Sequence, residues 1–311
     1  MSEEKRTPII GTRASALAQW QTQQVVKALV EQNVTVETRL IKSEGDLNQV
    51  TPLYEMGITG VFTRSLDRAL LAGEIDIAVH SLKDVPTQLA NGLVLVAVLP
   101  RGNSNDILVL RPDEQAPSFD EVATIATGSL RRRAQWLHRY PDHEVAPLRG
   151  NVQTRLKKLN ESSWTGAVFA QAGLERLGLL SDLSYVELDW MIPAPAQGII
   201  GIVCRESDLQ QCASLQIINH APTFKAAELE RAFLRKLEGG CSAPIGAIAT
   251  VSEDSYTLKA VLMTPDGEES IEAEWSQVGE TPEHWGSTWA NDVLESGGSE
   301  IMEEIKDAQS H

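Results

Sequence analysis

Residues 74–87 read EIDIAVHSLKDVPT, and they predict a buried strand that carries polar side chains to one edge of a sheet. Ile75 to Val79 is a short apolar run with β-branched residues, which is typical of a buried strand. Pro86 has no N–H group to donate to a sheet, so we expect the strand to end before it. The residues left at its carboxyl end, where open α/β sheets bind ligands, are Ser81, Lys83 and Asp84. A polar strand end that only caps and solvates is the alternative interpretation of the same pattern.

The composition is that of a globular protein with more than one domain. The 311 residues are 42% hydrophobic and 23% charged, and this length predicts two or three domains with ample cores. No apolar run approaches the ~20 residues of a membrane span, and the first residues carry no secretory signal, so we expect a cytoplasmic protein. Cys204, Cys212 and Cys241 lack metal-ligand spacing, which predicts reduced thiols and no metal site.

The charge is unevenly distributed. The formal net charge is −16, which disfavours binding to nucleic acid or to an anionic membrane surface. Several arginines nevertheless fall in one short region, namely Arg131, Arg132, Arg133, Arg139, Arg149 and Arg155. A local basic patch on an acidic protein indicates a small anionic ligand rather than a polymer.

Strand and helix patterns alternate along the first two thirds of the chain. The first unit has strand patterns at 8–11, 34–41 and 93–99 and helix patterns at 15–32 and 62–72. A second unit, from about residue 100, has strand patterns at 107–110, 123–126, 144–148 and 167–170. This alternation predicts mostly parallel, doubly wound α/β sheets. Residues 43–60 have little periodicity and predict a long loop, a frequent form of lid.

The last third predicts a small α+β domain. Ile199 to Cys204 is an apolar strand that we expect to return to the first sheet. A helix is expected at 224–237, an antiparallel pair at 256–263 and 269–275, and a terminal helix at 285–295. We therefore expect three domains, formed by 1–99 with 200–219, by 100–199 and by 220–311.

Three junctions between a strand and a helix share one design, in which a hydroxyl or amide and an arginine lie where the helix begins. They are Arg13 with Ser15, Arg131 and Arg132 with Ser129, and Arg149 with Asn151 and Arg155. Helix N-termini attract anions through free N–H groups, and a guanidinium group matches a carboxylate. Two interpretations remain open: binding sites for an anion, or ordinary N-caps beside solvated arginines.

Cys241 follows Gly239 and Gly240 at the expected end of a helix. The thiol is either a small packed side chain or a nucleophile on a flexible loop. The preceding helix end carries negative partial charge, which does not favour a thiolate. A nucleophilic role therefore needs activation from elsewhere or a reactive electrophile.

The combination and order of five segments resemble the porphobilinogen deaminase family over nearly the whole chain. The segments are TRAS at 12–15, DIAVHSLKDVP at 76–86, TGSLRR at 127–132, LRGNVQTR at 148–155 and LEGGCSAPIG at 237–246. The resemblance implies two doubly wound domains like those of periplasmic binding proteins, with the active site between them, and a small third domain. It also implies a monomer that acts as hydroxymethylbilane synthase in tetrapyrrole biosynthesis.

In this family four porphobilinogen molecules are joined head to tail, each with loss of ammonia, and water then releases hydroxymethylbilane. The resemblance implies that Cys241 holds a dipyrromethane cofactor through a thioether bond and that this cofactor primes the chain. Asp84 is the implied catalytic carboxylate, because loss of ammonia gives a cationic azafulvene that a fixed negative charge stabilises. A reactive azafulvene is also the electrophile that a Cys241 nucleophile requires.

The remaining site residues implied by the resemblance bind the acetate and propionate groups of the cofactor and of the growing polypyrrole. They are Arg13, Ser15, Ser81, Lys83, Thr127, Ser129, Arg131, Arg132, Arg149, Asn151, Arg155 and Arg176. Porphobilinogen and the polypyrrole are the expected partners, with no nucleic acid and no membrane.

The expected lid departs from the family pattern. Most members have Gly-Gly-Lys-Gly where this chain has Gly57-Ile58-Thr59-Gly60, and Glu44 stands where a basic residue is common. These changes remove two cations near the anionic polypyrrole, so we expect weaker closure of the lid over it, with the catalytic core unaffected.

Two alternatives to the active enzyme remain open. A two-lobed binding protein for a small dicarboxylate would use the same arginines but would need neither Asp84 nor Cys241. A catalytically impaired paralogue is suggested only by the altered lid.

Overall fold

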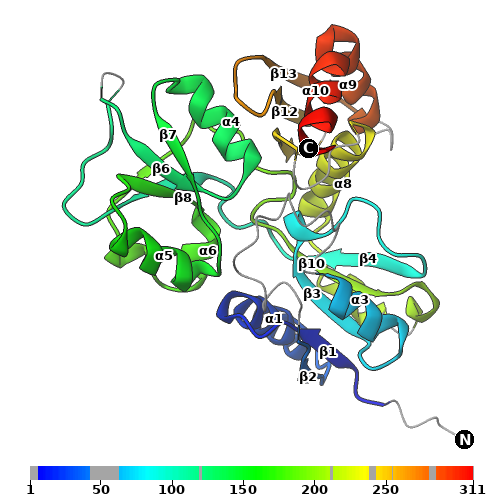
Figure 1. Ribbon diagram of the computed structural model, residues 1–311. Helices are drawn as coiled ribbons and strands as arrows, with labels where there is room; N and C mark the ends of the chain where they lie inside the picture. The colour runs from blue at the N-terminus through cyan, green and yellow to red at the C-terminus, as the bar shows by residue number, and fades with distance from the viewer. Residues whose placement is uncertain are drawn as a thin grey trace, which may run out of the picture. The chain divides into compact units, whose positions relative to one another are not determined.

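Figure 1 shows a computed structural model of the protein, which describes residues 6–42, 63–118, 121–210, 213–237, 243–253, 255–279 and 285–310. The chain forms two compact units. The first takes in the described residues of 6–101 and 199–224, and the second those of 102–198 and 225–310.

The first unit is built on a five-stranded sheet with the order β2-β1-β3-β10-β4. Its strands are β1 (Ile9–Thr12), β2 (Glu37–Leu40), β3 (Ile77–Ser81), β4 (Leu93–Val98) and β10 (Ile200–Arg205). β1 pairs in parallel with β2 and β3, whereas β10 runs antiparallel to β3 and β4. The predicted return of 199–204 to the first sheet is therefore confirmed.

Helices cover both faces of this sheet. The helices and 3-10 turns of the unit are α1 (Ala16–Glu31), α3 (Arg64–Leu71), α7 (Ala213–Ile217), η1 (Leu82–Asp84) and η3 (Glu206–Asp208). Ile77 and Val79 of β3 share a core with Leu29 of α1, whereas Ala78 between them shares a core with Leu70 of α3. Since successive residues of a strand face opposite sides, β3 is buried on both faces, as a doubly wound sheet requires.

β3 begins two residues later than the apolar run predicts. Ile75 is fully buried, but its N–H group donates to the carbonyl of Ala69 at 3.3 Å, so Ile75 belongs to the turn that leaves α3. The Asp76 carboxylate accepts a hydrogen bond from the N–H group of Ile9 at 2.9 Å and ties this turn to β1. The strand ends at Ser81, before Pro86 as predicted, and the chain turns at once into η1.

The second unit contains a five-stranded sheet with the order β7-β6-β8-β5-β9. Its strands are β5 (Asp106–Leu110), β6 (Thr124–Thr127), β7 (Glu144–Pro147), β8 (Gly166–Ala170) and β9 (Tyr185–Glu187). The helices and the 3-10 turn are α4 (Leu130–Arg139), α5 (Val152–Glu161), α6 (Gln171–Arg176) and η2 (Leu180–Asp182). β9, a three-residue strand with two exposed side chains, has too short a pattern to be predicted.

Both five-stranded sheets repeat one arrangement, with a parallel set of strands interrupted by a single antiparallel strand. The interrupting strands are β10 and β5, which pair antiparallel with both of their neighbours. Each begins shortly after the chain passes from one compact unit to the other, at 198–199 for β10 and at 101–102 for β5. The mixed α/β, doubly wound class is confirmed, and the antiparallel strands are the ones that follow these crossings.

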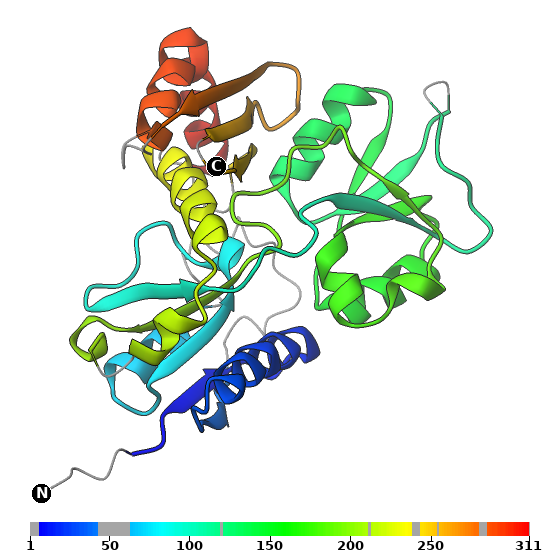
Figure 2. The same cartoon turned by 180° about the vertical axis from the view of Figure 1, so that it is seen from behind.

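The second unit also contains a three-stranded antiparallel sheet of β11 (Ile245–Val251), β12 (Ser255–Met263) and β13 (Ser270–Val278). Its helices are α8 (Ala221–Lys236), α9 (Trp285–Val293) and α10 (Ser299–Ser310), and the last two are joined by a kink, η4 (Leu294–Gly298), where Ser296 and Gly297 leave helical geometry. Phe233, Leu258 and Trp289 pack in one core between this sheet and its helices. The predicted hairpin is confirmed, whereas β11 and α10 were not predicted. Figure 2 shows these elements from behind.

The turn between β12 and β13 rests against α4 of the five-stranded sheet. Gly267 has a φ of +82°, and a Cβ atom there would collide with the carbonyl oxygen of Ala134. The carbonyl of Gly267 accepts a hydrogen bond from Nδ1 of His138 at 2.8 Å. The predicted second and third domains thus lie in one compact unit, and the bounds of three separate domains stay a prediction.

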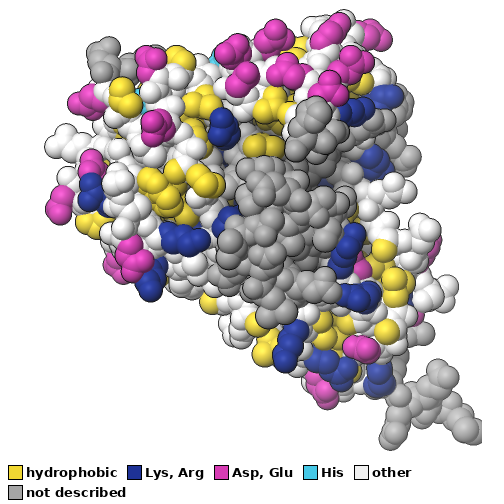
Figure 3. All heavy atoms as spheres, viewed as in Figure 1, with side chains coloured by type: hydrophobic (Ala, Val, Ile, Leu, Met, Phe, Trp, Pro, Cys, Tyr) yellow, Lys and Arg dark blue, Asp and Glu magenta, His cyan; other side chains and the backbone are white. Residues whose placement is uncertain are grey.

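The acidity of the protein is concentrated at its C-terminal end. From residue 220 onward the sequence has 18 Asp and Glu but only 6 Lys and Arg. Figure 3 shows acidic side chains gathered over the region where Figure 1 places α9, α10 and β13. The first two thirds of the chain are close to neutral, so the net charge of −16 does not oppose an anion site there.

Among the described residues, no helix is both long enough and apolar enough to span a membrane. The same residues contain no group of three His, Cys, Asp or Glu side chains arranged to bind a metal ion.

Candidate active site

The first unit gathers five predicted site residues at one edge of its sheet. β1 and β3 are parallel neighbours, with Ile10 opposite Ile77 and Gly11 opposite Ala78. Because parallel strands end at the same edge, the residues that follow them meet there. These residues are Arg13 and Ser15 after β1, and Ser81, Lys83 and Asp84 at the end of β3.

Two of the hydroxyl groups at this edge have structural partners. Ser15 is the N-cap of α1, and its Oγ accepts a hydrogen bond from the N–H group of Ala18 at 3.3 Å. Ser81 Oγ accepts a hydrogen bond of 2.8 Å from Nε2 of Gln21, a buried side chain of α1. Ser15 therefore matches the capping interpretation of its pattern, and α1 is fixed to the end of β3 through Gln21.

Asp84 is held on a short, rigid turn. Leu82 at the start of η1 is fully buried, and the N–H group of Val85 donates to its carbonyl at 3.1 Å. Lys83 and Asp84 are half-buried on the same turn. In the part of the chain that the structure describes, no side chain donates a hydrogen bond to the Asp84 carboxylate.

His80 lies next to this edge and is buried in β3. Burial, with a smaller effect of the positive charge of Arg13, lowers the pKa of His80 from 6.5 to about 4. His80 is therefore neutral at physiological pH, and its Nε2 has no hydrogen-bond partner among the described residues.

The shifted pKa of His80 predicts a loss of stability in mild acid. The unfolded chain takes up a proton near pH 6.5 but the folded chain only near pH 4, so stability falls as the pH drops through this window. Between pH 7 and pH 5 the expected loss from His80 is about 2 kcal/mol. Urea unfolding at both pH values should show a smaller loss for His80→Gln than for the wild type, and equal losses would contradict the assignment.

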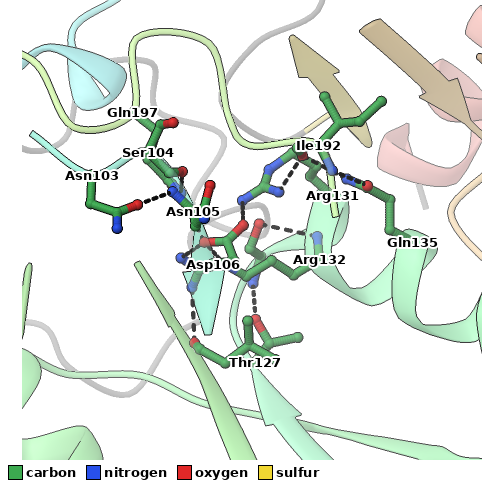
Figure 4. Close-up of polar contacts among 12 residues, drawn as sticks. Asn103, Ser104, Asn105, Asp106, Thr127, Arg131, Arg132, Gln135, Ile192 and Gln197 are labelled. Carbon is green, nitrogen blue, oxygen red and sulfur yellow. Dashed lines mark hydrogen bonds and ion pairs between the residues drawn. The ribbon is translucent and has the colours of Figure 1, made fainter. Parts of the chain in front are cut away.

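In the second unit, Arg131 and Arg132 converge on a buried carboxylate that the sequence did not single out (Figure 4). Asp106 is fully buried, and its Oδ2 accepts a hydrogen bond from Nη2 of Arg131 at 2.7 Å. Its Oδ1 accepts from Nη2 of Arg132 at 2.7 Å and from Nε of Arg132 at 3.1 Å. Burial, and to a smaller degree repulsion from Arg132, lower the pKa of Arg131 against the attraction of Asp106.

Two backbone carbonyls also accept hydrogen bonds from Arg131 and Arg132. Nη1 of Arg131 donates to the carbonyl of Ile192 at 2.7 Å, and Nη1 of Arg132 donates to the carbonyl of Val168 at 2.9 Å. Gln135, one turn after Arg131, also binds Ile192, since its Nε2 donates to the carbonyl at 2.9 Å and its Oε1 accepts from the N–H group at 2.7 Å.

Arg149 differs from Arg131 and Arg132 in having no acidic partner among the described residues. It is 8% exposed at the carboxyl end of β7, and burial lowers its pKa. Among the described residues its Nε has no hydrogen-bond partner, and no acidic side chain pairs with it. A buried guanidinium group without a counter-ion is costly, and an anionic ligand would remove that cost.

The other predicted residues of this unit surround the same loops. Ser129 Oγ accepts from the N–H group of Arg132 at 3.5 Å, and Asn151 Oδ1 accepts from that of Thr154 at 2.9 Å, so both are N-caps. Thr127 Oγ1 accepts from the N–H group of Ser129 at 3.2 Å. Two further contacts join Nε of Arg155 to the carbonyl of Gly150 at 2.8 Å and Nη2 of Arg176 to that of Gly198 at 2.6 Å. Burial lowers the pKa of Arg176.

Several predictions fall outside the described residues. They concern the thiols of Cys212 and Cys241 and the lid residues Glu44 and Thr59. Cys204 is described and is fully buried in the core of the first sheet, as expected of an unreactive thiol.

Sequence reasoning missed Asp106, Gln197 and Gln21. An available signal for Asp106 was an acid at the start of the apolar strand 107–110, because a buried charge is rarely found without a partner. Gln21 and Gln197 gave no comparable signal, since each is one polar residue among many.

The comparisons with known proteins identify the family of the chain. Residues 9–213 match the family model described as porphobilinogen deaminase, dipyromethane cofactor binding domain, and residues 224–295 match the porphobilinogen deaminase C-terminal domain. The porphobilinogen deaminase of Pelobacter propionicus is 40% identical over 302 residues, covering 95% of this chain and 96% of that protein. That of Desulforudis audaxviator is 40% identical over 305 residues, covering 97% of this chain and 99% of that protein.

Among solved structures, the methionine-binding protein MetQ is similar with a TM-score of 0.44 and 12% identity, over 72% of this chain and 95% of that protein. The family models cover most of the chain, and the relatives match it over nearly its full length. The chain belongs to the porphobilinogen deaminase family.

Proposed function

We propose that this chain is a working hydroxymethylbilane synthase in which Asp84 is the catalytic carboxylate and the arginines of the second unit bind substrate carboxylates. Membership of the family makes it a transferase that joins porphobilinogen units with release of ammonia. The observation that carries the assignment of the arginines is the buried Arg149 guanidinium group, which has no acidic partner among the described residues.

Asp84 supplies a negative charge at a fixed position. Loss of ammonia from porphobilinogen leaves a cationic azafulvene, and a carboxylate near the pyrrole N–H group stabilises that charge more in the transition state than in the ground state. The η1 turn suits this role, because the buried Leu82 fixes the backbone beneath a carboxylate that no described residue engages.

The arginines supply the opposite charge for the acetate and propionate groups of the pyrroles. Within the described parts of the chain, Arg149 Nε has no hydrogen-bond partner, and the Arg131–Arg132 pair has one carboxylate for two cations. Hydrogen bonds from guanidinium groups to carboxylates are among the stronger ones in proteins. Arg13, Lys83, Arg155 and Arg176 belong to the same proposal, with Ser15, Ser81, Thr127, Ser129 and Asn151 as polar neighbours.

The dipyrromethane cofactor is the group that the first family model names. Its carboxylates fit a site that holds more buried cations than anions, as the second unit does at Arg149 and at Asp106. When bound, it supplies the primer to which porphobilinogen units are joined. Cys241 is the proposed attachment residue. We further propose that the enzyme acts as a monomer in the cytoplasm.

The mass of the intact protein tests this function. The purified wild type should be heavier than its sequence by two porphobilinogen units less two ammonia molecules, and it should convert porphobilinogen to hydroxymethylbilane. Cys241→Ser should lose the added mass, whereas Cys204→Ser, which changes a buried thiol, should keep it. A wild type without added mass and without turnover would contradict the proposal and favour a binding protein or an impaired paralogue.

A further inference from the structure

We propose that Asp106, supported by Gln197, is a positioning residue that orients the Arg131–Arg132 pair and leaves it one positive charge in excess for a ligand carboxylate. This inference rests on the proposed function. It adds two residues that themselves contact no substrate and act through the arginines.

The geometry leaves the two guanidinium groups little freedom. Each donates to Asp106, and each donates through Nη1 to a backbone carbonyl, that of Ile192 or that of Val168. Arg131 is 4% exposed and Arg132 is 5% exposed, so packing also restricts both side chains. Removal of the Asp106 carboxylate would remove the acceptor that both side chains share.

The charges in this cluster do not balance. Asp106 is the acidic partner of both Arg131 and Arg132, and no other described carboxylate forms an ion pair with either. A buried cluster with a net charge of one is unfavourable unless a further charge of opposite sign approaches it. One carboxylate of a ligand would provide that charge, whereas a second internal acid would abolish the need for it.

Gln197 connects this cluster to the segments that link the two compact units. Its Nε2 donates to Oδ1 of Asp106 at 2.9 Å and to the carbonyl of Ser104 at 2.8 Å. The next residue, Gly198, accepts hydrogen bonds from the N–H group of Gly102 at 3.0 Å and from Nη2 of Arg176 at 2.6 Å. Arg176, a third arginine of the proposed site, is thus bound to Gly198, the neighbour of the Gln197 that binds Asp106.

A purely structural role for Asp106 is the competing explanation, and the chain offers a matched control for it. Asp76 in the first unit also joins two arginines, since its Oδ1 accepts from Arg6 at 2.5 Å and from Arg205 at 2.8 Å. It is 9% exposed and lies before the amino end of β3, the end opposite Asp84. Asp76→Asn and Asp106→Asn therefore each remove a carboxylate that two arginines share. The Asp76 contact is the more exposed one, since the Arg6 side chain is 63% exposed, and it lies at the end of β3 opposite Asp84, whereas Asp106 lies beside the proposed ligand arginines.

The experiment compares full-length wild type with Asp106→Asn, Gln197→Met and Asp76→Asn. Three quantities are measured for each: the melting temperature, the fraction of molecules with the cofactor mass, and the KM and kcat for porphobilinogen. Both aspartate variants should melt several degrees below the wild type. Asp106→Asn should raise KM about tenfold or more and lower the fraction with cofactor, whereas Asp76→Asn should leave both within about twofold. Gln197→Met keeps every charge and should raise KM about threefold with a small change in melting temperature.

The proposal is overturned if Asp106→Asn matches Asp76→Asn in KM and in cofactor content. Should Asp106→Asn fail to fold, Gln197→Met decides, and wild-type KM and cofactor content in that variant would overturn the proposal. A wild type that makes no hydroxymethylbilane is a separate result, because it refutes the proposed function before any variant is compared.

Discussion

Asp84→Asn is expected to lower kcat by about 100-fold or more while the protein stays folded and keeps its covalent cofactor mass. The amide has nearly the shape of the carboxylate but cannot supply its negative charge to the developing azafulvene cation. Since no described residue hydrogen-bonds to the Asp84 carboxylate, its replacement breaks no contact of the described structure, and the melting temperature should change little. Single-turnover measurements with porphobilinogen separate this slow chemical step from substrate binding.

Glu74→Gln provides the matched control for this prediction. Glu74 is an exposed acid that precedes β3, so its replacement removes the same charge at the opposite end of the strand. Its turnover should equal that of the wild type, which would show that the loss in Asp84→Asn depends on position and not on net charge. Wild-type turnover in Asp84→Asn would refute the catalytic role of Asp84.

The local pattern of the sequence was sufficient to predict the edge of the first sheet. Residues 77–81 form a strand, Ser15 caps a helix, and Asp84 follows at the carboxyl end of the strand. Each of these features depends on residues only a few positions apart, through strand propensity, capping and the missing N–H group of proline. The apolar run at 199–204 also indicated the strand β10 and its return to the first sheet.

The partners of the arginines could not be predicted in the same way. Asp106 lies 25 and 26 residues before the two arginines that it binds, and 91 residues before Gln197. Nothing in a linear pattern indicates which guanidinium group is already paired inside the fold. Arg131 and Arg149 have similar sequence settings, each near the start of a helix, yet only Arg131 has an internal carboxylate partner among the described residues.

This difference divides the arginines of the second unit into two kinds. Arg131 and Arg132 have most of their donors bound by the protein itself, so they act through position and net charge. Among the described residues the Nε atoms of Arg131 and Arg149 both lack a hydrogen-bond partner, but only Arg149 also lacks an acidic partner, so Arg149 is the arginine best suited to bind a ligand carboxylate directly. The distinction predicts opposite effects on stability: removal of the Asp106 carboxylate should destabilise the protein, whereas removal of the Arg149 charge should not.

Arg149→Met is therefore expected to bind the anionic substrate poorly without becoming less stable. The methionine fills part of the same apolar space and removes a buried cation that no described acid balances, so the melting temperature should equal or exceed that of the wild type. A hydrogen bond to a charged group contributes about 1.5–3 kcal/mol, so KM for porphobilinogen should rise about 10- to 150-fold. Arg133→Met removes the same charge from an exposed position on α4 and should leave KM and melting temperature near the wild-type values. If Arg149→Met instead melts well below the wild type and keeps its KM, the Arg149 guanidinium group stabilises the fold and the ligand carboxylates bind elsewhere.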